Sequence, residues 1–129
     1  ARSVAAALAF QPDRPIEENL RAIDRALAAL RSARVVASDA TASPNHGKMV
    51  AWLDDSSCFD GDDLTGVTLG ALSRLGASER EIITLYHGRG VSVREREALI
   101  ARVTGEFPGQ HVESVVGGQA RDLICLSCE

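Results

Sequence analysis

The glycine turn Gly88-Arg89-Gly90 is the part of this sequence whose residue types best suit the binding of an anion. It lies between an apolar segment at residues 81–87 and Ser92, where a helical pattern begins. Amides left free by such a turn at a helix N-terminus bind phosphate, and an arginine adds a bidentate donor. The dinucleotide-binding fingerprint requires a third glycine where this sequence has Val93. An ordinary strand-to-helix turn is therefore favoured, with His87 and Arg89 as the surface groups that could meet a ligand or a partner.

Cys125 and Cys128 have the Cys-x-x-Cys spacing found in zinc and redox sites. A structural zinc site needs four ligands, and a redox pair normally lies at the N-terminus of a helix. Residues 122–128 have the composition of a strand, on which residues three apart point to opposite faces. We therefore expect two separate strand cysteines with no metal between them.

Acidic and histidine residues also have the types found in metal and catalytic sites. The acidic ones are Asp54, Asp55, Asp60, Asp62 and Asp63. This run lacks the alternating ligands, central glycine and closing glutamate of an EF-hand loop, so we expect a solvated turn and a helix cap. The histidines at positions 46, 87 and 111 share no ligand spacing, and no Gly-x-Ser-x-Gly motif occurs. The sequence therefore indicates no catalytic residue and no metal site.

The composition excludes several classes of protein. With 129 residues, of which 45% are hydrophobic and 25% charged, the chain fits one globular domain over residues 1–129. It contains no run of about 18 apolar residues that could span a membrane. A net charge of −4 disfavours broad attraction to nucleic acid or to an anionic membrane. Lys48 is the only lysine, so no other residue could serve as the lysine of a P-loop or of a Schiff base.

The first residues and the cysteine count bear on the origin of the chain. It begins with Ala1 and enters a short apolar stretch at residues 4–10 that matches a signal peptide poorly. We therefore expect a piece excised from a longer protein. An odd count of three cysteines does not suggest a secreted disulfide framework, which points to the cytoplasm.

Three segments have the pattern of helices. Residues 15–33 carry an apolar stripe made of Ile16, Leu20, Ile23, Leu27 and Leu30. A second helix should be capped by Asp62 or Asp63, end at Gly76, and bury Leu64, Val67, Ala71 and Leu75. A third should begin at a capping box formed by Ser92 and Glu95 and bury Leu99, Val103 and Phe107.

Strand-like segments occupy residues 34–39, 48–54, 81–87, 111–116 and 122–128, with a short one near Cys58 and Phe59. Turns at residues 41–47 and at Gly117-Gly118 should close two hairpins, and residues 81–116 should form a right-handed parallel crossover. The order α-β-β occurs twice, which suggests a duplicated half. We predict an α/β fold: a two-layer sandwich with a mixed parallel and antiparallel sheet and about three helices. His87 and Arg89 should then be exposed beside residues 117–119, because parallel strands end at one edge.

The order and spacing of several short motifs resemble the C-terminal region of bacterial dihydroxyacetone-kinase-like proteins, which are grouped with the A subunit of fatty acid kinase. In the first half these are residues 4–10, Glu18-Asn19 and residues 35–39. In the second half they are residues 81–88, Glu106-Phe107-Pro108, Gly117-Gly118-Gln119 and Ser127-Cys128-Glu129. The resemblance covers essentially the whole chain.

The resemblance implies a DegV-like fold and a non-catalytic docking role. In that family an N-terminal kinase domain binds ATP and magnesium, and a separate DegV-like subunit presents a fatty acid whose carboxylate becomes an acyl phosphate. The C-terminal domain holds that acyl-binding subunit. This chain would thus need no cofactor of its own, and its partners would be its own kinase domain and the acyl-binding subunit. The alternative is an independent small-molecule-binding domain or enzyme that uses the loop at residues 87–89.

The candidate residues for binding a partner or ligand are Asp39, His87, Gly88, Arg89, Gly117, Gly118 and Gln119. The sequence departs from the family pattern beside three of these positions. Ser38 stands where an arginine commonly precedes the aspartate, and Ala120 and Asp122 stand where proline and tyrosine usually follow. Arg89-Gly90 replaces an acidic pair, which reverses the charge of that loop.

Overall fold

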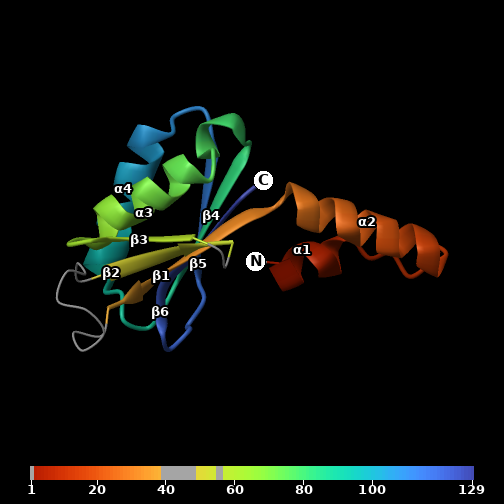
Figure 1. The fold of residues 1–129 in the computed structure, drawn as a ribbon, viewed down its shortest axis with the longest axis horizontal. Coiled ribbons are helices and arrows are strands. Elements are labelled where there is room, and N and C mark those ends of the chain that lie inside the picture. The colour runs from red at the N-terminus through yellow and green to blue at the C-terminus, as the bar shows by residue number, and fades with distance from the viewer. Residues whose placement is uncertain (1, 39–48, 55–56) are drawn as a thin grey trace.

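The computed structural model describes residues 2–38, 49–54 and 57–129 (Figure 1). Within these ranges the helices are α1 (Arg2–Ala9), α2 (Ile16–Ala29), α3 (Leu64–Arg74) and α4 (Val93–Glu106), with a 3-10 turn η1 at Ala77–Glu79. The strands are β1 (Arg31–Ala37), β2 (Met49–Leu53), β3 (Ser57–Gly61), β4 (Ile82–His87), β5 (His111–Val116) and β6 (Asp122–Cys128). The predicted turn at residues 41–47 lies outside the described residues.

The six strands form one sheet in the order β3-β2-β1-β6-β4-β5. β4 and β5 run parallel, and every other neighbouring pair is antiparallel. The predicted mixed sheet and the parallel pairing after residues 81–87 are confirmed. The predicted hairpin of the last two strands is wrong, because β6 lies between β1 and β4 and does not pair with β5.

Burial explains why β6 takes the centre of the sheet. Its residues Ile124, Leu126 and Cys128 are completely buried on one face, whereas β5 is exposed over its last four residues. A strand that is shielded on both sides suits the more apolar sequence, and the exposed strand suits an edge.

Helices α3 and α4 cover one face of this sheet (Figure 1). The predicted stripes of both helices are buried there, and Leu72, Leu99 and Val103 have no exposed surface. Asp63 caps the N-terminus of α3 by accepting a hydrogen bond of 2.8 Å from the Gly66 amide. Gly76 follows the C-terminus of α3 in the left-handed conformation, with φ of 71°. Ser92 and Glu95 form the predicted capping box at α4, whose hydrogen bonds lower the pKa of Glu95.

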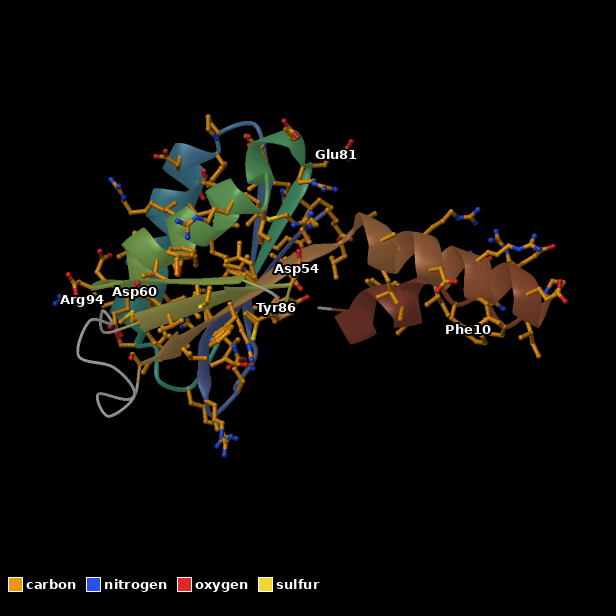
Figure 2. All side chains as sticks on the ribbon, in the orientation of Figure 1. Phe10, Asp54, Asp60, Glu81, Tyr86 and Arg94 are labelled. Atoms are coloured by element: carbon orange, nitrogen blue, oxygen red, sulfur yellow. The ribbon has the colours of Figure 1, made fainter. Side chains whose placement is uncertain are left out.

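Helices α1 and α2 pair with each other and project from the sheet as a hairpin, on which Figure 2 labels Phe10. Two residues of the predicted apolar stripe, Ile16 and Leu20, are therefore 77% and 56% exposed. Only Leu30 separates α2 from β1, and one residue is too short a connection to fold a helix back across a sheet. The predicted duplication of an α-β-β unit is thus wrong in three dimensions, since α4 packs on the sheet and α2 packs on α1.

Asn19 fixes the loop of this hairpin although it lies within a helix. It is buried, its Oδ1 accepts a hydrogen bond of 2.8 Å from the Gln11 amide, and its Nδ2 donates to the carbonyl oxygens of Gln11 and Arg14. A buried side-chain amide with all of these groups bonded holds the loop in one conformation.

Replacing Asn19 by alanine should loosen the hairpin without loosening the sheet. Loss of three hydrogen bonds, at about 1 kcal/mol or less each, should speed amide exchange in α1 and in the loop by roughly tenfold or more. Amides of β1, β4 and β6 should exchange at the wild-type rate. Asp24→Ala, at an exposed position of α2, is the control. Unchanged exchange in α1 would show that Asn19 does not hold the hairpin.

Candidate functional site

Two loops of the candidate site meet at one end of the sheet. β1 and β4 both run antiparallel to β6, and β5 runs parallel to β4, so the carboxyl ends of these three strands share one end with the start of β6. The loop after β4 contains Gly88 and Arg89, and the loop after β5 contains residues 117–121. Asp39, the remaining candidate, lies outside the described residues.

Five hydrogen bonds join the loop after β5 to the end of β4 and to the loop that follows β4. The amides of Gly117 and Gly118 donate to the His87 carbonyl oxygen at 2.9 and 3.1 Å. Arg89 donates from its amide to the Gln119 carbonyl oxygen at 3.0 Å and from Nε to the Gly118 carbonyl oxygen at 2.8 Å. The Gln119 Nε2 donates to the Tyr86 carbonyl oxygen at 2.8 Å. The predicted neighbourhood of the loops is confirmed, and the contacts hold both in a fixed conformation.

At this end of the sheet, several backbone amides that could bind a phosphate already donate hydrogen bonds within the chain. The Gly88 amide donates to the Leu123 carbonyl oxygen at 2.8 Å, and the Arg89 amide is bonded to Gln119. At the start of α4, the Glu95 carboxylate accepts from the Ser92 amide at 2.8 Å. A phosphate would need such amides free. The ordinary strand-to-helix turn favoured by the sequence fits these contacts.

His87 is buried, which corrects the prediction that it is exposed. Only 1% of it is accessible, because it continues the alternation of Ile83 and Leu85 toward the face that α4 covers. Its Nε2 lies 2.9 Å from the Ser114 Oγ, and its buried Nδ1 has no hydrogen-bond partner among the described residues. An unpaired lone pair costs less than an unpaired N–H, so we assign the proton to Nε2, as donor to Ser114. The ring is then not placed to activate the hydroxyl as a base.

Arg89 is exposed beside the turn at residues 117–119, as predicted. Only its Nε is engaged by a carbonyl oxygen, and the described part of the chain offers its guanidinium no carboxylate partner. Its terminal nitrogens thus remain available as a fork of donors for a carboxylate or phosphate from outside.

The two cysteines of the Cys-x-x-Cys lie on β6 with opposite orientations, as expected for strand residues. Cys128 is buried in the core, and Cys125 faces the other side, where its Sγ lies 3.5 Å from the Asp122 Oδ2. Burial, and for Cys125 also the charge of Asp122, raises the pKa of each thiol to about 11. Both are therefore protonated near neutral pH and are poor nucleophiles.

Within the described residues, no three His, Cys, Asp or Glu side chains converge to hold a metal ion. The acidic stretch instead has structural roles. Asp63 caps α3, and Asp54 accepts a 2.7 Å hydrogen bond from the Arg31 Nε where β2 meets β1. No helix of the described residues has the length and hydropathy needed to cross a membrane.

One feature of this end was not predicted from the sequence: an open-sided hollow on the face of the sheet opposite α3 and α4. It is lined by Arg34, Val36, Ala37, Trp52, Arg121 and Asp122. The available signal was the alternation of β1 and β2, which puts Arg34 and Trp52 opposite the core residues Val35 and Ala51.

Replacing Gly88 by alanine should destabilise the fold. A Cβ at this position would collide with the Asp122 carbonyl oxygen, which is backbone and cannot turn aside. We expect a loss of roughly 2 kcal/mol or more in the free energy of unfolding, measured by urea denaturation. The control is Gly109→Ala, where a Cβ meets open space. Equal stability of the two variants would contradict the close packing of the loops.

The buried His87 should make the fold less stable in mild acid. Burial first, and the charge of Arg96 second, lower the pKa of His87 below its usual 6.5. As the pH falls below about 6.5, the unfolded chain binds a proton that folded His87 does not, so stability decreases. His87→Gln should reduce this decrease between pH 7.5 and pH 5.5 in urea titrations. Replacing the exposed His111 by glutamine should not, and an equal effect would refute the assignment.

Two comparisons with known proteins bear on the identity of the chain. A family model for the C-terminal region of proteins like the A subunit of fatty acid kinase matches residues 1–129. A search of curated proteins gave no match. The match spans every element described above, including the two hydrogen-bonded loops that follow β4 and β5. The chain therefore belongs to the fatty acid kinase A-like family and corresponds to its C-terminal region.

Proposed function

We propose that this chain is a docking domain. It holds a DegV-like, acyl-binding subunit so that a separate kinase domain, using ATP and magnesium in the cytoplasm, phosphorylates the fatty acid carboxylate. The chain corresponds to the C-terminal region of proteins in the fatty acid kinase A-like family, and this correspondence supports the docking role. The phosphoryl transfer itself is assigned to the kinase domain, and this chain contributes binding and orientation.

The observation that carries the proposal is the fixed conformation of the two loops at the end of the sheet. Three of the five hydrogen bonds come from backbone amides, and two come from the side chains of Arg89 and Gln119. A surface that is ordered before the partner arrives loses little conformational entropy on binding. The exposed guanidinium of Arg89 on this surface gives the partner a charged group of defined position.

The alternative, an independent enzyme or ligand-binding domain built on residues 87–89, has less support. His87 is buried and its Nε2 is hydrogen-bonded to the Ser114 Oγ, so its ring does not reach a substrate at the surface. Gly88 packs against backbone, and the amides of Gly88 and Arg89 are already bonded. What remains at the surface is a single arginine, which suits recognition better than catalysis.

Arg89→Glu should weaken docking more than stability. The variant reverses an exposed charge and loses one hydrogen bond to the Gly118 carbonyl oxygen, which is worth about 1 kcal/mol or less. Association with the purified acyl-binding subunit should slow several-fold at low salt, and the difference should shrink at high salt. Surface plasmon resonance at two salt concentrations measures both effects.

The charge-matched control is Arg102→Glu, at an exposed position of α4. It should associate at the wild-type rate, within the effect of net charge. Equal slowing by both variants would mean that total charge, and not the loop, governs docking. Transfer of phosphate from ATP by the 129-residue chain alone would contradict a docking role altogether.

A further inference from the structure

The hollow described above lies on the face of the sheet opposite α3 and α4, next to the loops at residues 88–91 and 117–121. Its volume is about 660 Å³, and it opens broadly to solvent. Arg121 reaches it from the loop after β5, two residues beyond Gln119, and Asp122 begins β6. The hollow is therefore continuous along the chain with the loop that Arg89 contacts.

Strand register determines how the floor of the hollow is composed. Arg34 on β1 pairs directly with Trp52 on β2 and, on its other side, with Cys125 on β6. Val36 follows on the same face of β1. The floor thus places a guanidinium beside an indole ring and an aliphatic side chain, and a second guanidinium comes from Arg121.

The described residues compensate the positive charge of the hollow only in part. Among the described residues, neither Arg34 nor Arg121 forms an ion pair or a side-chain hydrogen bond. Of the described residues that line the hollow, only Asp122 has a carboxylate, and it lies next to the Cys125 thiol. Among the described lining residues, two arginines and one aspartate leave a surplus positive charge, on a chain whose net charge is −4.

The shape of the hollow favours a protein partner over a small molecule. Ligand pockets generally bury 70–90% or more of a small ligand, which an open-sided hollow on a sheet cannot do. Tryptophan and arginine, by contrast, are the residues that most often dominate the binding energy of protein interfaces. Trp52 is a large apolar side chain that is 37% exposed, so its ring is available to such a partner.

We propose that this hollow receives a glutamate or aspartate side chain of the docked acyl-binding subunit, and that an apolar side chain next to that carboxylate packs against Trp52. This inference rests on the proposed docking function and names where the partner is anchored. The carboxylate lies between the guanidinium groups of Arg34 and Arg121, where either can bind it in a bidentate manner.

The first experiment tests the hollow without the partner. Trp52 is the only tryptophan, so a ¹⁵N-labelled chain has one indole N–H signal, and that signal reports on the hollow. The probe is a capped hexapeptide with two glutamates flanked by leucines, and its counterpart has glutamines instead. We expect a saturable shift with the glutamate peptide, at least threefold smaller with the glutamine peptide. Octanoate and inorganic phosphate serve as small-molecule anions.

Variants assign the shift to the two arginines. The double variant Arg34→Ala, Arg121→Ala should abolish the response to the glutamate peptide, and Arg102→Ala on α4 should keep it. Both replaced side chains in the double variant are exposed, so its thermal midpoint should stay near that of the wild type. Equal shifts with both peptides, no shift with either, or a stronger response to octanoate or phosphate would overturn the proposal.

The second experiment uses the purified acyl-binding subunit. The double variant should bind it at least tenfold more weakly than the wild type, and the Trp52 indole signal should move in the wild-type complex. Equal binding of wild type and double variant would refute the hollow as anchor and leave docking intact. Absence of binding by the wild type would refute the docking function, and the peptide response would still report on the hollow by itself.

Discussion

β6 is inserted between β1 and β4, and its backbone hydrogen bonds to both strands hold the sheet together. It joins two pieces, β3-β2-β1 and β4-β5, that have no strand pairing with each other. It also determines the path of residues 117–121. β5 lies on the far side of β4, so the chain must cross the carboxyl end of β4 to reach β6, and there it meets the His87 carbonyl oxygen. The crossing brings Arg121 to the hollow beside Arg34.

Local patterns in the sequence predicted most of the individual elements. Asp63, Gly76 and the Ser92–Glu95 capping box mark the bounds of α3 and α4 through bonds between residues close in sequence. The strands were predicted from short runs of apolar residues, a signal that is also local in the sequence. The parallel pairing of β4 and β5 followed as well, because a helix between two strands allows the chain to return in the same direction.

Long-range choices could not be predicted in the same way. The five residues between β5 and β6 suggested a hairpin, but β6 pairs with β1, whose partner residues lie about ninety positions earlier in the chain. Burial across the whole sheet decides this pairing. The hollow depends on it as well, since Arg34, Trp52 and Arg121 are brought together only by the order of the strands. The burial of His87, in contrast, follows from its alternation with Ile83 and Leu85 and was within reach of the sequence.

We propose that residues 117–121, by crossing the end of β4, create the surface that docks the acyl-binding subunit. Amide hydrogen exchange of the 129-residue chain, free and saturated with the purified subunit, tests it most directly. We expect added protection at residues 88–91 and 117–123 and in β1 and β2 beside Trp52, with none in α3 or α4. Protection confined to the outer surfaces of α3 and α4, or to the α1–α2 hairpin, would contradict it.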